Sequence, residues 1–205
     1  TGKAPLRETL AAALVLDSGW DGSSPLLDPF CGAGTIVIEA ALLAAGIPPG
    51  IKRRFAFMDW PAFDPALWEE IAGAAGPPRI KGQAPILASD RDEGAVQAAR
   101  ENAERAGVGG RIDFSCRAVS AIEPPARPGY ILTNPPYGVR LGPEEKLKRL
   151  YAQLGNIARR KCPGWRVSFF STSPVLSRST GLSVAPGIQT RNGGIRVRIV
   201  KGRVA

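Results

Sequence analysis

Hydrophobic positions along the chain form short apolar runs, separated by longer segments in which apolar residues recur at helical spacing. The runs predict strands at residues 25–27, 86–90, 111–115, 130–133, 165–170 and 195–200. The helical spacing predicts helices at 6–16, 36–45, 92–106 and 146–161. Strands that alternate with helices predict an α/β fold with a mostly parallel sheet. The last strand alternates apolar residues with Arg196 and Arg198, as a half-solvated strand does.

Residues 48–85 interrupt this alternation and predict an insertion between the first core helix and the second strand. Pro48-Pro49-Gly50 ends the regular pattern, and a short helix is predicted at 65–75. The insertion carries five aromatic residues, which are Phe55, Phe57, Trp60, Phe63 and Trp68. We expect these side chains to pack mostly onto the body of the domain.

Composition narrows the classes of protein that fit this pattern. The 205 residues are enough for a single domain with a sizeable core, and the hydrophobic fraction of 44% is ordinary for a globular protein. No apolar run is long enough to span a bilayer. The three cysteines are widely separated and odd in number, so we expect no disulfide framework, no metal site and a reducing cytoplasm. The chain has no histidine, so any catalysis must work without an imidazole base.

The net charge of +9 is concentrated in the C-terminal part of the chain. Residues 1–123 hold 12 Lys or Arg against 16 Asp or Glu, a net charge of −4. Residues 124–205 hold 15 against 2, a net charge of +13. This asymmetry favours a nucleic-acid partner over a basic surface that only aids solubility. Candidate phosphate contacts are Arg140, Lys146, Lys148, Arg149 and Arg191.

A glycine-rich segment, Asp28 to Thr35, joins the first buried strand to the following helix. Gly32 and Gly34 can adopt positive φ and expose backbone N–H groups to a ligand. Asp28 ends the strand and can only accept hydrogen bonds, so it suits an amino group and not a phosphate. The alternative is a tight turn that only lets strand and helix pack. The residues Asp28, Pro29, Phe30, Cys31, Gly32, Ala33, Gly34 and Thr35 resemble motif I of S-adenosylmethionine (SAM) dependent methyltransferases. The resemblance implies that this loop binds SAM.

Asp90 ends the second predicted strand. An acid at this position holds ribose hydroxyls in many nucleotide-binding sheets, so we expect Asp90 to bind the ribose of the cofactor. It lies 62 residues after Asp28, where about 20 is usual, and the insertion accounts for the difference. The alternative is a helix N-cap or a surface acid.

The fourth predicted strand runs directly into Asn134, Pro135, Pro136 and Tyr137. The two prolines fix the direction of the turn. The amide oxygen of Asn134 and the carbonyl of Pro135 can accept both hydrogens of a planar exocyclic amine. Asn134 is also a candidate contact of the cofactor. Tyr137 offers a flat face on which a flipped base can stack. The alternative is a rigid surface turn, but the position after a strand and downstream of a SAM-type loop favours the catalytic interpretation.

Several further segments extend the resemblance over nearly the whole chain. They are Ala4-Pro5-Leu6 with Glu8 to Ala11, Ile38 to Ala41, Asn134 to Gly142, Leu150-Tyr151 with Leu154-Gly155, and Asn192-Gly193. Together they resemble the THUMP-associated RNA guanine-N2 methyltransferases, in particular the bacterial large-subunit rRNA type. The resemblance implies a Rossmann-like class I fold with an antiparallel C-terminal strand and helices on both faces of the sheet. It also implies SAM as cofactor and N2 of guanosine in 23S rRNA as acceptor.

The same resemblance implies an N-terminal RNA-binding THUMP region. The chain begins without Met or a signal peptide, so we expect it to be the catalytic domain of a longer protein, with residues 1–205 forming one domain.

One departure and several alternatives remain. The family often has an acid that contacts the adenine amine after the third strand, whereas this chain has Cys116-Arg117-Ala118. A tRNA guanosine-N2 enzyme and an adenine-N6 DNA methyltransferase share the same amine chemistry. A non-catalytic RNA-binding domain with the same fold is the alternative from another class.

Overall fold

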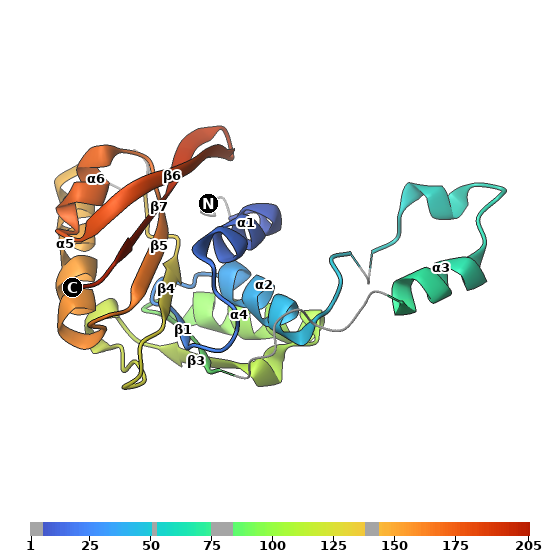
Figure 1. The fold of residues 1–205 in the computed structure, drawn as a ribbon, viewed down its shortest axis with the longest axis horizontal. Coiled ribbons are helices and arrows are strands. Elements are labelled where there is room, and N and C mark those ends of the chain that lie inside the picture. The colour runs from blue at the N-terminus through green and yellow to red at the C-terminus, as the bar shows by residue number, and fades with distance from the viewer. Residues whose placement is uncertain (1–5, 51–52, 75–83, 138–143) are drawn as a thin grey trace.

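The computed structural model describes residues 6–50, 53–74, 84–137 and 144–205, and a single seven-stranded sheet runs through them (Figure 1). The strand order is β3-β2-β1-β4-β5-β7-β6. The first five strands pair in parallel, whereas β7 is antiparallel to both β5 and β6. The strands are β1 (Leu26–Asp28), β2 (Ile86–Asp90), β3 (Ile112–Cys116), β4 (Tyr130–Thr133), β5 (Arg166–Ser171), β6 (Ser183–Asn192) and β7 (Ile195–Arg203).

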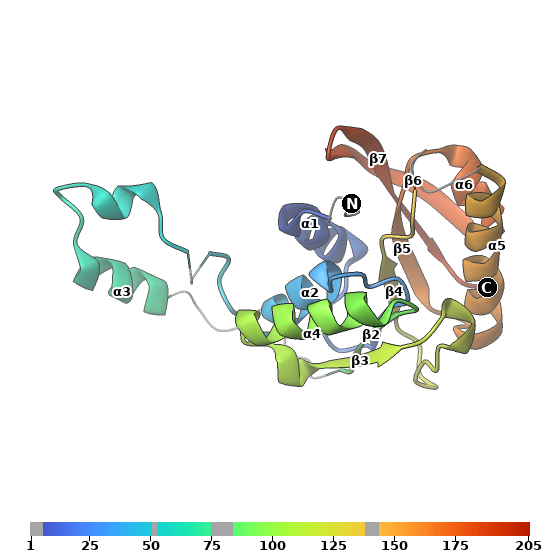
Figure 2. The same cartoon turned by 180° about the vertical axis from the view of Figure 1, so that it is seen from behind.

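Helices cover both faces of this sheet, as predicted (Figures 1 and 2). The α-helices are α1 (Glu8–Ser18), α2 (Thr35–Ala45), α3 (Pro65–Gly73), α4 (Glu93–Ala106), α5 (Glu144–Lys161) and α6 (Pro174–Ser179). The described ranges also contain the short 3₁₀ turns η1 (Ala56–Asp59), η2 (Gly109–Arg111) and η3 (Val119–Ala121). None of the helices in the described ranges is long and apolar enough to cross a membrane.

Two apolar layers form the core, one on each face of the sheet. Residues of α1, α2 and α4 pack on one face, and residues of α5 and α6 pack on the other. The strands supply both layers because successive side chains point to opposite faces, so Leu26 lies in the first layer and Leu27 in the second. On α5, the ring of Tyr151 is fully buried and packs edge-on against Phe169 at a centroid distance of 6.0 Å.

The C-terminal hairpin is longer than the sequence pattern predicted. A single antiparallel strand at 195–200 was expected, but β6 and β7 form two antiparallel strands and α6 precedes them. β6 lies at the edge of the sheet and is largely exposed, and its register shifts between Pro186 and Gln189. An exposed edge strand with an irregular register has little apolar alternation, which is why the pattern did not reveal it.

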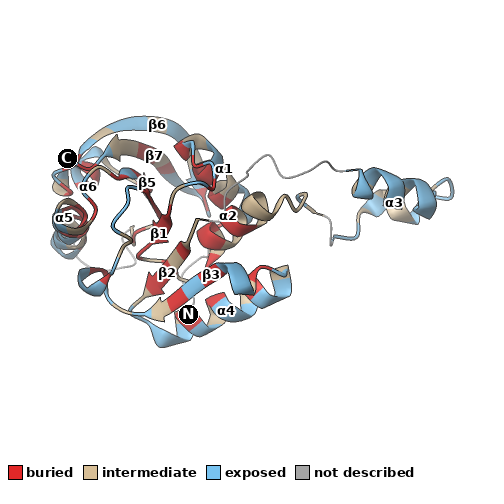
Figure 3. Cartoon of the chain, turned by 60° about the horizontal axis from the view of Figure 1, so that its bottom comes forward, coloured by how far each residue is buried: buried red, intermediate tan, exposed pale blue. Residues whose placement is uncertain are grey.

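The insertion does not pack onto the body, and that prediction was wrong. Figures 1 to 3 show η1 and α3 projecting away from the sheet and its helices, with α3 mostly exposed. The aromatic rings contact one another instead: Phe57 lies 5.4 Å from Phe55 and 5.4 Å from Trp68 between ring centroids. Trp60 remains 67% exposed. Aromatic content therefore indicated a hydrophobic cluster, but the partners of that cluster lie within the insertion itself.

Candidate active site

The predicted site residues meet at the carboxyl ends of the parallel strands. The chain passes from β1 to β2 and β3 on one side and then returns to β4 on the other side, so the strand order reverses between β1 and β4. Ligands of open α/β sheets bind beyond the carboxyl ends of the strands at such a point. Asp28 ends β1 and Asn134 follows β4, and the hydroxyl of Thr133 donates a 2.6 Å hydrogen bond to Asp28 Oδ1. The structure therefore joins the two predicted motifs directly.

Asp28 is a buried carboxylate that organises the loop. It is 1% exposed, and its Oδ1 also accepts the N–H of Phe30 at 3.1 Å. Burial raises the pKa of Asp28 to about 7. The hydrogen bonds from Thr133 and Phe30 oppose this rise, and the charge of Asp90 adds to it. Direct contact between Asp28 and a ligand amino group stays a prediction.

The two loop glycines have different roles. A Cβ on Gly32 would meet no atom within 4 Å, so the space beside this residue is open. The prediction that both glycines expose their N–H groups was wrong, because Gly32 donates to Asp90 Oδ2 and Gly34 donates to the carbonyl of Cys31. A Cβ on Gly34 would lie 3.0 Å from Cβ of Ala99 on α4, so this glycine permits close packing. Both residues have positive φ, +52° for Gly32 and +84° for Gly34. The loop is also fastened to α4 by a 2.9 Å hydrogen bond from Asn102 Nδ2 to the carbonyl of Ala33.

Substituting these two glycines separates packing from ligand access. We expect Gly34→Ala to lower the free energy of unfolding by about 2–4 kcal/mol, because it adds steric overlap to the strain of positive φ. Gly32→Ala adds only the strain, about 1–2 kcal/mol, but places a methyl group where the loop is open. Urea unfolding of both variants measures the difference. Equal destabilisation by the two substitutions would contradict this division of roles.

Asp90 ends β2, at the same end of the parallel strands, and contacts the glycine loop. Its Oδ2 accepts the N–H of Gly32 at 3.1 Å, and its Oδ1 accepts the N–H of Asp92 at 3.1 Å. The N-cap of α4 is Asp92, whose Oδ1 accepts the N–H of Ala95 at 3.2 Å. The N-cap alternative for Asp90 is therefore wrong. Its contact with a ribose stays a prediction, and the geometry places the carboxylate beside the open space at Gly32.

Asn134 carries a buried acceptor without a donor. Its Oδ1 has no hydrogen-bond partner among the described residues. Buried acceptors are nearly always satisfied, so an unpaired one beside the motif loop is suited to a donor from a ligand. Residues 138–142, the remainder of the predicted motif, lie outside the described residues.

A hydrogen bond from the edge strand β6 holds the side chain of Tyr137. Asn192, at the end of β6, donates a 3.0 Å hydrogen bond from Nδ2 to the Tyr137 hydroxyl. Burial raises the pKa of Tyr137, while hydrogen bonds from the side chains of Asn192 and Asn134 lower it in part. The hairpin that the pattern missed thus positions a predicted site residue.

Sequence reasoning did not assign roles to three polar contacts of this site. Thr133, Asn102 and Asn192 each hold a predicted residue in place. The available signals were weak. Thr133 directly precedes Asn134 in the sequence, and Asn192 belongs to a segment that resembles the family.

The candidate phosphate contacts predicted from the sequence differ in their exposure and in their ion-pair partners. Lys148 forms exposed ion pairs with Glu145 at 2.8 Å and Glu144 at 3.5 Å, so it already has carboxylate partners. Arg140 lies outside the described residues, whereas Lys146, Arg149 and Arg191 are exposed. At the family's usual acidic position, Arg117 pairs with Glu123 at 2.8 Å. Within the described ranges, no group of three or more Cys, Asp or Glu side chains is placed to hold a metal ion.

Comparison with known families agrees with this geometry. A family model described as UPF0020, RMKL-like, methyltransferase domain, matches residues 1–201. The ribosomal RNA large subunit methyltransferase K/L of Shewanella baltica is 43% identical over 201 residues, which are 95% of this chain and 28% of that protein. The chain spans 53% of a second relative, from Synechocystis, that is 40% identical. The chain is thus similar to one part of longer proteins.

Two solved structures share the fold over nearly the whole chain. A methyltransferase candidate in complex with S-adenosylhomocysteine (SAH) gives a TM-score of 0.88 at 28% identity, covering 100% of this chain and 54% of that chain. A Listeria monocytogenes protein described as a predicted N6-adenine-specific DNA methylase gives 0.80 at 30% identity, covering 97% and 52%. The glycine loop and the β4 loop both lie within this shared fold.

Proposed function

Because the chain belongs to the UPF0020 family of RMKL-like methyltransferase domains, we propose that it methylates N2 of guanosine in 23S rRNA. The chain is a SAM-dependent methyltransferase domain with a class I fold, as its family and its SAH-bound structural neighbour indicate. The acceptor base and the site residues are our proposal. The observation that supports an amine as acceptor is the unpaired Oδ1 of Asn134, which follows the end of β4. The choice of ribosomal RNA rests on the similarity to the Shewanella enzyme.

We assign the cofactor to the loop that follows β1. The buried Asp28 and the open space beside Gly32 would receive the amino-acid part of SAM, and Asp90 would bind its ribose. When bound, SAM supplies a methyl group on a positively charged sulfur that is a good neutral leaving group. The residues of the chain therefore need to bind and orient, and they need not supply a strong acid or base.

We assign the base to the β4 loop. Asn134 Oδ1 and the Pro135 carbonyl would accept the two hydrogens of the exocyclic amine, which turns its lone pair towards the methyl group. Tyr137 would stack on the base, with its hydroxyl fixed by Asn192. The proton released after transfer can pass to water, so the absence of histidine is compatible with this chemistry.

Two rivals share the same geometry at the amine. Guanosine in tRNA presents the same N2 group, and adenine in DNA presents a similar amine at N6. The description of the Listeria neighbour supports the DNA alternative, whereas the name of the Shewanella relative favours ribosomal RNA. A non-catalytic RNA-binding domain is the remaining rival, and it need not bind SAM.

The test is methylation of defined acceptors by this chain. We would incubate it with labelled SAM and with unmethylated 23S rRNA, tRNA or DNA, then identify the modified nucleoside by mass spectrometry. We expect N2-methylguanosine in 23S rRNA. N6-methyladenine in DNA would favour the rival enzyme. SAM binding measured by calorimetry separates an inactive acceptor assay from a domain that binds no cofactor.

We also infer that residues 1–205 form one methyltransferase domain, with residues 48–85 inserted between α2 and β2. The single sheet that contains strands from residue 26 to residue 203 supports this assignment. An rRNA acceptor would place the reaction in the cytoplasm.

A further inference from the structure

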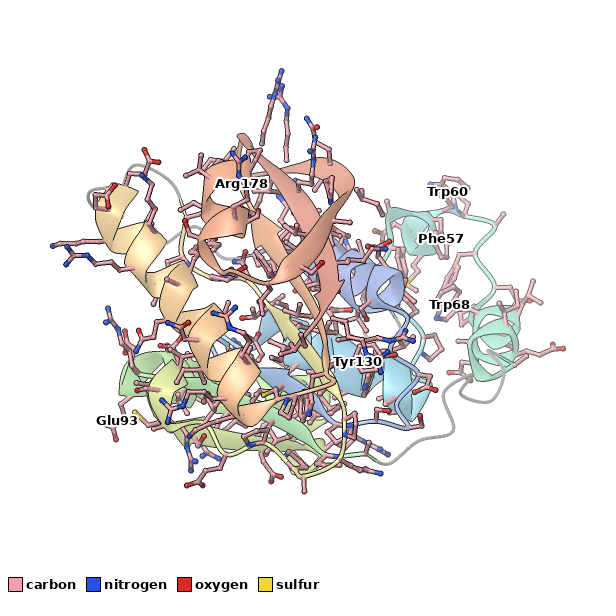
Figure 4. The ribbon with its side chains drawn as sticks, turned by 60° about the vertical axis from the view of Figure 1, so that its left-hand side comes forward. Phe57, Trp60, Trp68, Glu93, Tyr130 and Arg178 are labelled. Carbon is pink, nitrogen blue, oxygen red and sulfur yellow. The ribbon has the colours of Figure 1, made fainter. Side chains whose placement is uncertain are left out.

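A basic groove lies between α6 and the β6–β7 hairpin, on a part of the molecule that the proposed reaction does not use. Its volume is about 360 Å³. Arg178 of α6 and Arg196 and Arg198 of β7 line it, together with apolar residues that include Val184, Pro186 and Val200. Figure 4 shows Arg178 on this surface, on the opposite side of the molecule from the aromatic insertion.

The part of the chain that supplies the groove carries no acidic residue. The sequence contains no Asp or Glu from residue 146 to residue 205. Arg198 is held by a 2.8 Å hydrogen bond to Gln189 Oε1, a neutral acceptor that leaves its charge uncompensated. Among the described residues, none of the three forms an ion pair. A groove of this kind attracts anions.

The hairpin also places two like charges directly opposite each other. In the register of β6 and β7, Arg191 pairs with Arg196, and both side chains are exposed. Like charges directly across a strand pair destabilise the pairing. A polyanion that binds along this face would offset that cost, because it would bring phosphates to both guanidinium groups.

The groove begins close to the candidate base-binding loop. β4 and β5 are neighbouring parallel strands with Thr133 paired to Phe169, and Ser171, two residues beyond Phe169, lines the groove. Arg191 and Arg196 flank the same hairpin tip whose Asn192 contacts Tyr137. Because successive side chains alternate in a strand, Arg191 points to the opposite face of the hairpin from Asn192.

We propose that this groove binds the phosphodiester backbone of the RNA strand that flanks the target nucleotide. The inference rests on the proposed function, in which the base is held by the β4 loop. Arginine suits the task because its planar guanidinium donates two parallel hydrogen bonds to phosphate oxygens. One face of the hairpin then supports Tyr137, and the other face binds the phosphodiester backbone of the RNA.

The test is the salt dependence of RNA binding by the double variant Arg196→Gln/Arg198→Gln. The probe is a fluorescein-labelled single-stranded RNA of 20 nucleotides, and anisotropy gives the affinity between about 0.05 M and 0.3 M salt. Loss of two phosphate contacts should reduce the slope of log K against log salt by about 1.4 and weaken binding roughly 25-fold at about 0.1 M salt. The matched control is Arg127→Gln, an exposed arginine before the amino end of β4, the end of the strand opposite to the β4 loop. This control should change the affinity less than about threefold.

The outcomes separate this inference from the proposed function. The proposal that the groove binds RNA is wrong if the double variant binds RNA like the parent protein. It is also wrong if the control loses as much affinity as the double variant. Both conclusions hold even if the parent methylates rRNA. A groove-dependent loss of RNA binding supports the groove even if no methyl transfer is detected, and in that case the proposed reaction fails on its own assay. Calorimetry with SAH provides the folding control, because all three proteins should bind it equally.

Discussion

Asn134→Ala should lower the rate of methyl transfer by about 10²–10³-fold while SAM binding stays within about twofold of the parent. The magnitude is that of losing one preorganised hydrogen-bonding group that acts on the reacting centre. Asn134 Oδ1 is the acceptor that would orient the amine, and the cofactor is assigned mainly to Asp28, the glycine loop and Asp90. Single-turnover methylation and calorimetry measure the two quantities.

The same variant should be about as stable as the parent. A buried acceptor without a donor costs about 1–3 kcal/mol, and Asn134 Oδ1 is unpaired among the described residues. Removing the side chain removes this cost, but it also removes the hydrogen bond to Tyr137, which is worth about 0.5–1.5 kcal/mol. A loss of activity with little change in the free energy of unfolding would mark a residue kept for function and not for folding.

Asn156→Ala is the matched control for this prediction. Asn156 is exposed on α5, where its Oδ1 accepts a 2.6 Å hydrogen bond from Arg159. The same chemical change there should leave the methylation rate within about twofold and the stability within about 0.5 kcal/mol. If Asn134→Ala kept more than half of the parent's rate, the proposed role of the β4 loop would be abandoned.

The sequence predicted that the candidate site residues lie together because strand ends are topologically constrained. Once strands and helices alternate, parallel strands place Asp28, Asp90 and Asn134 at one edge of the sheet. The contacts within the site were not predictable in the same way. The hydrogen bond from Thr133 to Asp28 depends on the β1–β4 register, in which Leu27 pairs with Ile131, and a hydrophobic pattern does not specify register between distant strands.

The two failures of the pattern have a common physical cause. β6 and the insertion are both exposed, so neither needs the apolar periodicity that burial imposes on a core element. Aromatic residues in the insertion were assumed to seek the main core, but Phe55, Phe57 and Trp68 bury one another instead. Asn192 was noted in the sequence, yet its contact with Tyr137 required the hairpin that the pattern missed.

Asp28→Asn should stabilise the free protein in a manner that depends on pH. The pKa of Asp28 rises from 3.8 to about 7 on folding, so between these values the folded state binds more protons than the unfolded state. The free energy of unfolding of the parent therefore falls as pH rises through this window, by up to about 1.4 kcal/mol per pH unit. Asparagine does not titrate, and its Oδ1 can still accept from Thr133 and Phe30. The stability of the variant relative to the parent should rise by roughly 2–3 kcal/mol from pH 5 to pH 8.

Urea unfolding of both proteins at several pH values measures this difference. The matched control is Asp113→Asn, which changes an exposed carboxylate on β3 and should give a stability difference constant within about 0.5 kcal/mol. A pH-independent difference for Asp28→Asn would mean that burial does not raise the pKa of this carboxyl.

The free-energy cost of ionising the buried Asp28 has a functional explanation if the carboxylate binds a cationic ligand. SAM carries positive charge on its sulfur and its amino group, and a buried carboxylate attracts a nearby cation more strongly than an exposed one does. Asp28→Asn should therefore weaken SAM binding while it stabilises the fold, and calorimetry at pH 8 should show the largest loss, since the parent's carboxyl is then mostly ionised. Equal SAM affinity of both proteins at pH 8 would leave Asp28 only its observed task of joining the glycine loop to β4.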